Sequence, residues 1–132
     1  MKYAELVTHN YPIVIINLNP IDPTSQEIED FFNELEVFMD STTGPYVFVS
    51  YNKEFKYLSS QARLEIGTRA NKLNKKYAGR KLADIVVING LLSGLVLKSL
   101  TVIYKPLKDA IIFSTLEEGI QKAKEILSNH NS

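Results

Sequence analysis

The chain has 132 residues, no net formal charge and no cysteine. This length is typical of one domain with a real hydrophobic core, and 45% apolar with 23% charged residues is ordinary for a globular protein. The missing cysteines exclude disulfides and thiolate metal sites but leave the compartment open. No low-complexity tract or linker divides the chain, so we predict a single domain over residues 1–132, with 128–132 as a frayed tail.

Charge is distributed unevenly along the chain. The chain up to Leu58 contains three lysines and nine acidic residues, a net charge of −6. From Ser59 onward it contains twelve basic and six acidic residues, a net charge of +6. Such asymmetry either steers partners or reflects two oppositely charged helices that face solvent. We favour the second interpretation.

The first half of the chain alternates short apolar runs with one strongly periodic segment. Strands are predicted over about Lys2–Thr8 and Pro12–Leu18. Thr24 and Glu27 form a capping-box pattern, and the apolar residues behind them recur at helical spacing, which predicts a helix that begins at Thr24. The β-branched and aromatic run Tyr46–Tyr51 predicts the next strand.

The second half continues this alternation. Ser59–Ser60 indicates a helix start, and Ala78–Gly79 indicates its end. Strands are predicted at Ile85–Ile88 and Ala110–Phe113, and a capping box at Thr115–Glu118 begins the final helix. With a further helix between those two strands, the order is ββαβαβαβα. This order predicts an α/β fold with a mixed, mostly parallel five-stranded sheet and about four helices, the first strand running antiparallel.

The further helix, from about Leu91 to Tyr104, is apolar over most of its circumference. Only Gly94, Lys98 and Thr101 share a narrow, weakly polar sector. The segment is shorter than the roughly 20 residues that a membrane span needs. Either neighbouring strands and helices cover the excess apolar face, or a partner, an apolar ligand or a bilayer surface does. The candidate partner or ligand surface consists of Leu58, Leu91, Leu92, Leu95, Val96, Leu100 and Ile103.

Two short segments carry a family resemblance. The strand Tyr46–Tyr51, a short loop and Phe55–Ala62 resemble a strand, loop and helix start of the STAS-like, or SpoIIAA-like, domains of bacterial anti-sigma-factor antagonists. The segment Ile111–Ile120 resembles the final strand and helix start of that family, and the element order fits over nearly the whole length. The resemblance implies a STAS-like fold that works by contact with partners.

In the antagonists, a serine at the helix start is phosphorylated, so the resemblance makes Ser59 or Ser60 a candidate phosphoswitch. Leu58 stands where the family motif has an acid, and Gln61 stands where it has a glycine. A helix N-terminus suits a phosphate electrostatically. The simpler alternative is that Ser59 only caps the helix.

Other chemical signals are weak. His9 and His130 are the only histidines and stand outside any cluster of acids, which disfavours a metal site or a Ser-His-Asp triad. Gly90–Gly94 lacks the ending and the glycine spacing of nucleotide-binding loops. The basic run Lys72–Lys81 is the best candidate for an anionic surface, including acidic lipid headgroups, but the neutral chain disfavours nucleic acid.

We therefore expect a non-enzymatic STAS-like binding module without cofactor or metal. It would present the helix at 91–104 for self-association as a homodimer, for a protein partner, or for an apolar or lipid-like ligand. The alternative is a regulatory partner-switch protein phosphorylated at Ser59 or Ser60. The first continuous apolar run, Ile13–Ile16, is too short for a signal-peptide core, which favours a cytoplasmic location.

Overall fold

The computed structural model of this protein describes residues 2–54, 58–89 and 111–131. These ranges form five strands and three helices. They are β1 (Ala4–Val7), β2 (Ile13–Leu18), α1 (Ser25–Asp40), β3 (Tyr46–Asn52), α2 (Ser60–Lys76), β4 (Lys81–Ile88), β5 (Ile111–Phe113) and α4 (Leu116–Asn131). The predicted α/β class is confirmed, and so is the five-stranded, mostly parallel sheet. The sequence predicts about four helices where the described residues contain three, and the predicted helix at 91–104 lies outside them.

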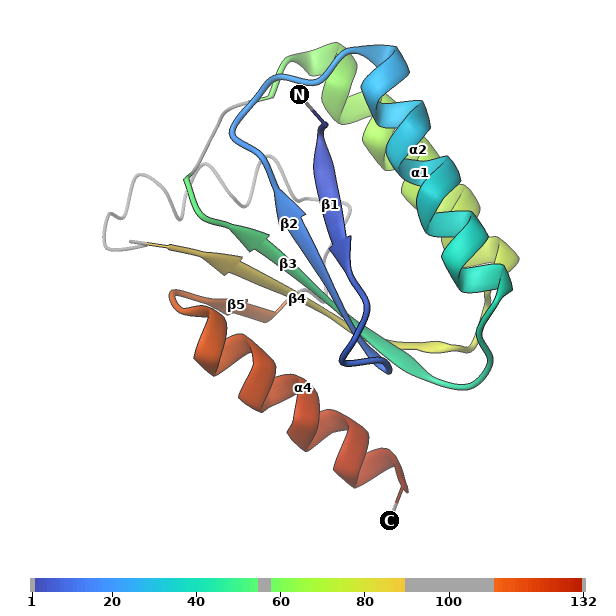
Figure 1. The fold of residues 1–132 in the computed structure, drawn as a ribbon, viewed down its shortest axis with the longest axis vertical. Helices are drawn as coiled ribbons and strands as arrows, with labels where there is room; N and C mark the ends of the chain where they lie inside the picture. The colour runs from blue at the N-terminus through green and yellow to red at the C-terminus, as the bar shows by residue number, and fades with distance from the viewer. Residues whose placement is uncertain (1, 55–57, 90–110, 132) are drawn as a thin grey trace.

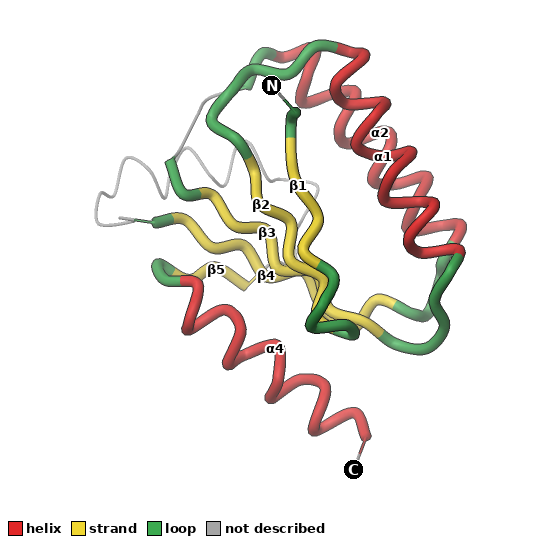
Figure 2. The backbone as a smooth tube through the Cα atoms, viewed as in Figure 1, coloured by secondary structure: helices red, strands yellow, loops and turns green. Residues whose placement is uncertain are grey.

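The strands lie in the sheet in the order in which they occur in the chain. β1 is antiparallel to β2, as predicted, and each later strand is parallel to the strand before it. Because β3 and β4 are added in the same direction, right-handed crossovers place both connecting helices on the same face. Figure 1 shows α1 and α2 together on one face of the sheet and α4 on the other, and Figure 2 shows the same three layers.

The helix starts follow the predicted capping chemistry. At α1, the backbone N–H of Glu27 donates to Thr24 Oγ1 at 3.1 Å, and the N–H of Thr24 donates to Glu27 Oε1 at 2.9 Å. This backbone hydrogen bond lowers the pKa of Glu27. At α2, the N–H of Ala62 donates to Ser59 Oγ at 3.1 Å, so the predicted N-cap serine is confirmed.

Residues 128–131, for which the sequence suggests a frayed tail, continue α4 to Asn131. The helix is amphipathic along its length, with Ala123 and Leu127 buried against the sheet. This inward packing near the C-terminal end stabilises helical structure where composition alone suggests fraying.

The α4 face of the sheet is packed closely with aliphatic side chains. Ile85, Val87 and Val49 are fully buried under α4. Gly119 permits this approach, because a Cβ atom there would come within 2.6 Å of Val87 Cγ2. A larger residue at this helix position would need the sheet or the helix to move.

The opposite face has a core that is rich in aromatic rings. Tyr3 packs edge-on against Phe31, with ring centroids 5.7 Å apart, and Phe31 packs in the same manner against Phe32 at 5.2 Å. From the sheet, Tyr46 and Phe48 are buried in the same cluster. Such edge-to-face contacts are the preferred arrangement of aromatic pairs.

α1 and α2 run parallel, and three of the polar contacts between them share a sequence offset of 40 residues. Ser25 Oγ donates to Glu65 Oε1 at 2.6 Å, and the offset repeats in the ion pairs Arg69–Glu29 and Lys76–Glu36, both at 3.7 Å. The acids of α1 therefore face the bases of α2. This pairing agrees with the favoured interpretation of the uneven charge distribution, namely two oppositely charged helices.

Candidate functional site

A cavity of about 180 Å³ lies between α1, α2 and the aromatic face of the sheet. For comparison, an engineered cavity of about 150 Å³ in another protein stays dry and binds benzene. We call this space the α2 cavity. Most of its wall is apolar and consists of Tyr3, Ile16, Leu18, Phe31, Phe32, Leu35, Phe48, Leu58, Ile66, Gly67, Ala70 and Leu73.

The cavity exists because the inner side of α2 carries small residues. Only Ala62 and Leu73 of this helix are buried, whereas α1 buries three large aromatic or aliphatic residues in its central turns alone, Phe31, Phe32 and Leu35. A Cβ atom built at Gly67 meets no atom within 4 Å. The space next to α2 is therefore left open by the sequence of the helix itself.

Several polar side chains lie together on the sheet side of the cavity wall. Lys81 Nζ donates to Asp84 Oδ2 at 2.6 Å and to Asn74 Oδ1 at 3.0 Å, and the side chains of Lys81 and Asp84 are each about one-fifth exposed. Ser50 of β3 also lines the cavity. Because the ion pair between Lys81 and Asp84 is partly buried, solvent and salt screen its attraction less than that of a pair on the open surface.

A bulge in the sheet makes this ion pair possible. Side chains three residues apart on a regular strand point to opposite faces. Between β3 and β4 the register shifts at Tyr46/Val47, so that Tyr46 is opposite Lys81 while Val47 is opposite Ala83. The extra residue turns Lys81 to the same face as Asp84, a re-aiming that is typical of β-bulges.

Besides Lys81, the cavity wall contains a second positively charged residue, Arg63. Its Nη2 donates to Ser60 Oγ at 3.1 Å, but its Nε is buried and has no hydrogen-bond partner in the described part of the chain. Leaving a buried donor without an acceptor costs about 1–3 kcal/mol. An acceptor that entered the cavity and reached the guanidinium would recover part of this cost.

The two predicted serines differ in their surroundings. Ser59 caps α2 through its side chain, and its own N–H donates to Asp22 Oδ1 at 2.9 Å. Ser60 is the first residue of the helix, is exposed, and accepts its hydrogen bond from Arg63. A negative charge is therefore opposed by a nearby carboxylate at Ser59 and favoured by a guanidinium at Ser60.

Among the predicted surface residues, Leu58 lies in the wall of the α2 cavity. The others fall outside the described residues; they are Leu91, Leu92, Leu95, Val96, Leu100 and Ile103.

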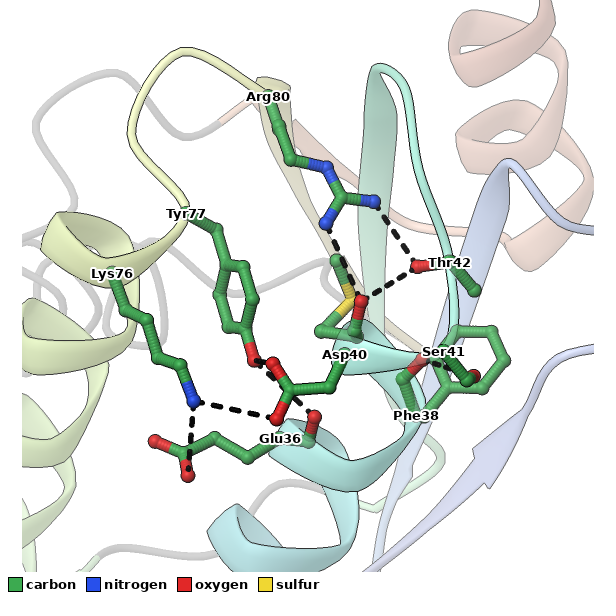
Figure 3. Close-up of polar contacts among 9 residues, drawn as sticks. Glu36, Phe38, Asp40, Ser41, Thr42, Lys76, Tyr77 and Arg80 are labelled. Atoms are coloured by element: carbon green, nitrogen blue, oxygen red, sulfur yellow. Dashed lines mark hydrogen bonds and ion pairs between the residues drawn. The ribbon is translucent and has the colours of Figure 1, made fainter.

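A polar network joins the C-terminal ends of α1 and α2 (Figure 3). The hydroxyl of Tyr77 donates to the carboxylate of Asp40 and lies 3.2 Å from the backbone oxygen of Glu36, while Lys76 Nζ pairs with Asp40 at 3.4 Å. The hydrogen bond from Tyr77 lowers the pKa of Asp40. These contacts fix the distance between the two helices at this end.

Arg80 extends the same network to the loop after α1. Its Nε donates to the backbone oxygen of Gly44 at 2.8 Å, and its Nη2 donates to Thr42 Oγ1 and to the hydroxyl of Tyr11, each at 3.1 Å (Figure 3 shows the contact with Thr42). The guanidinium also lies 5.4 Å from the ring centroid of Tyr46. Such contacts indicate a structural role for Arg80.

Most of the cavity residues are not predicted from the sequence. Ser50 and Asp84 interrupt apolar strands with polar side chains on the face that contains the cavity, and Gly67 lines the cavity next to the inner stripe of α2 without a side chain. These interruptions are the available signal. The basic run Lys72–Lys81 is predicted as a surface for anions, but three of its charges, on Lys76, Arg80 and Lys81, make internal contacts.

Comparison with protein-family models and with curated proteins finds no match for this chain. Within the described ranges, no group of three or more His, Asp or Glu residues is arranged to hold a metal ion. None of the helices in the described part of the chain is long and apolar enough to cross a membrane.

Proposed function

We propose that this protein is a non-enzymatic binding domain whose ligand is a small, largely apolar molecule held in the α2 cavity. The observation that carries the proposal is the open space beside Gly67 in a wall that is mostly apolar and contains a few polar side chains. Concave, mostly apolar spaces with a few converging polar groups are typical of ligand sites.

The test uses a neutral probe and a variant that fills the site. Toluene is titrated into the isotope-labelled protein and followed by amide chemical shifts. Gly67→Leu places a side chain in the cavity and is expected to abolish the shifts at Phe48 and Leu73. Leu64→Ala is the matched control, because Leu64 is on the same helix and 70% exposed. Absence of binding to wild type, or equal binding to Gly67→Leu, would contradict the proposal.

A finer version of the proposal assigns the chain to the STAS-like domains and adds a docking role for the helix predicted at 91–104. Its support is the resemblance in the sequence and the apolar character of that segment. Leu92→Glu and Val96→Glu are expected to shift the protein to a smaller species in size-exclusion chromatography if the segment mediates self-association. A wild type that is monomeric and binds no hydrophobic dye would remove this role.

The second candidate is a serine phosphoswitch, and the contact between Ser60 and Arg63 favours Ser60 over Ser59. A phosphate on Ser60 would lie at a helix N-terminus and beside a guanidinium, both of which stabilise its charge. Mass spectrometry of the protein purified from cells is expected to find the phosphate at Ser60. Phosphate at Ser59 alone, or at neither residue, would count against this candidate.

A further inference from the structure

The geometry points to a specific ligand class for the α2 cavity: a small aromatic monocarboxylate, with its ring on the phenylalanines of the wall and its carboxylate on Arg63. This inference rests on the proposed binding function and adds the chemistry of the ligand. Three properties of the cavity carry it: the volume, the aromatic wall and the charge balance.

The volume limits the ligand to about one ring with a short substituent. The cavity measures about 180 Å³. Most drug-sized sites are larger, about 300–1,000 Å³, whereas about 150 Å³ suffices for benzene. A long acyl chain, a nucleotide or a sterol would therefore extend beyond the described walls of the cavity.

The wall favours a flat aromatic ring over a branched aliphatic group. Phe31, Phe32 and Phe48 line the cavity, and Phe31 and Phe32 are already arranged edge to face at 5.2 Å. A further ring can extend this arrangement, since aromatic pairs gain from offset and edge-to-face contacts in addition to apolar burial.

The charges of the wall favour an anion. Arg63 and Lys81 are positive and Asp84 is negative, so the formal charges of the wall sum to a single positive charge. Lys81 is neutralised by Asp84 at 2.6 Å. Among the described residues, no carboxylate lies within ion-pair distance of Arg63, and its side chain donates to the neutral hydroxyl of Ser60. The uncompensated charge is therefore on Arg63.

The shape of the guanidinium group specifies the anion further. Arginine presents several donors in a planar fork that matches a carboxylate in a bidentate manner. Among the described residues, the buried Nε of Arg63 has no acceptor, and its Nη2 donates to Ser60 Oγ. A carboxylate near Lys81 would instead meet the negative charge of Asp84. Arg63 is thus the better anchor, and a positively charged ligand is disfavoured at both places.

Three probes of similar size separate the ligand class from the binding function: phenylacetate, benzyl alcohol and benzylamine. Each is titrated into wild type, Arg63→Gln and Arg69→Gln, and the dissociation constants are measured by chemical shifts. Arg69 is the matched control, because it lies on the same helix and pairs with Glu29 outside the cavity wall. Gly67→Leu reports whether the shifts arise from the cavity.

We expect wild type to bind phenylacetate about tenfold more tightly than benzyl alcohol, a difference of about 1.4 kcal/mol, and benzylamine most weakly. Arg63→Gln is expected to remove the preference for phenylacetate without changing the affinity for benzyl alcohol, and Arg69→Gln is expected to change neither. Equal binding of all three probes, all blocked by Gly67→Leu, would overturn the carboxylate ligand and leave the binding function intact. No binding of any probe would overturn both.

Discussion

On one face of the sheet, a methyl group at Gly119 of α4 would come within 2.6 Å of Val87 Cγ2, whereas on the other face a methyl group at Gly67 of α2 meets no atom within 4 Å. The two glycines have opposite roles in packing. Gly119 permits a helix to approach the sheet closely, and Gly67 leaves a space that the helix does not fill.

The difference reflects how each face is held together. α4 packs directly onto fully buried aliphatic side chains such as Ile85 and Val87. α2 is held beside α1 by hydrogen bonds and ion pairs along its side and at its end, including Tyr77–Asp40 and Arg69–Glu29. A helix that is held by polar contacts along its edge can leave open space beneath it. A ligand site is therefore compatible with the α1/α2 face, whereas the described residues under α4 are closely packed.

The largest expected effect is at the close-packed face. Gly119→Ala should lower the free energy of unfolding by about 2 kcal/mol, because overpacking a rigid core outweighs the better helix propensity of alanine. Urea denaturation of wild type and variant measures this difference. An unchanged or increased stability would show that α4 can shift away from Val87, and the contrast between the two faces would then fail.

Two tyrosines that differ in hydrogen bonding test whether polar contacts stabilise the α1/α2 face. Tyr77→Phe should cost about 1.5 kcal/mol, because the variant loses the hydrogen bond to the Asp40 carboxylate. Tyr46→Phe is the matched variant. The Tyr46 hydroxyl is buried and has no hydrogen-bond partner among the described residues, and burial raises its pKa to about 12. Its removal should therefore leave stability unchanged or slightly higher. Equal losses in urea denaturation would contradict the distinction.

Gly67→Ala should have the opposite sign to Gly119→Ala. Alanine is favoured over glycine inside a helix by about 1 kcal/mol, and the added methyl group meets no neighbour. We expect a gain of about 0.5–1 kcal/mol by the same urea measurement. A loss of stability would mean that the space beside Gly67 is smaller than the structure shows.

The smallest effect concerns acid titration at the helix ends. The hydrogen bond from Tyr77 lowers the pKa of Asp40 in the folded state. The ionised carboxylate therefore stabilises the fold above the ordinary aspartate pKa of about 3.9, and this contribution is lost as pH falls through the lower folded value. An NMR titration of the Asp40 carboxyl carbon should show the lowered pKa in wild type and a higher pKa in Tyr77→Phe, in which the contact with Lys76 remains. Identical titrations would remove the assigned role of Tyr77.

The sequence predicts the elements of this fold well where a local signal defines them. The capping pattern at Thr24 and Glu27 and the periodic apolar residues behind it identify α1, and Ser59 identifies the start of α2. β4 begins at Lys81, four residues before the predicted strand, because a bulge and the pairing with β3 extend it over residues of mixed polarity. Those contacts are not encoded in the local pattern.

The candidate site is less predictable for a physical reason. A cavity forms where several elements meet and their side chains leave space unfilled. No single segment of the sequence therefore predicts it. Leu58 is predicted as a surface residue for partners or ligands and lies in the cavity wall. Lys81 belongs to the basic run predicted as a surface for anions, whereas Arg63 and Asp84 are not predicted as site residues. Their proximity depends on the helix position over the sheet and on the register shift at Tyr46/Val47.

The sequential strand order also has a consequence for synthesis of the chain. Each strand pairs with the strand that precedes it, so the sheet can assemble in the order in which the chain leaves the ribosome. α4 comes after all five strands, and until its 16 residues emerge it cannot cover Val49, Ile85 and Val87. A chain stalled or clipped before Leu116 thus carries an open aliphatic surface of the kind that chaperones and proteases act on.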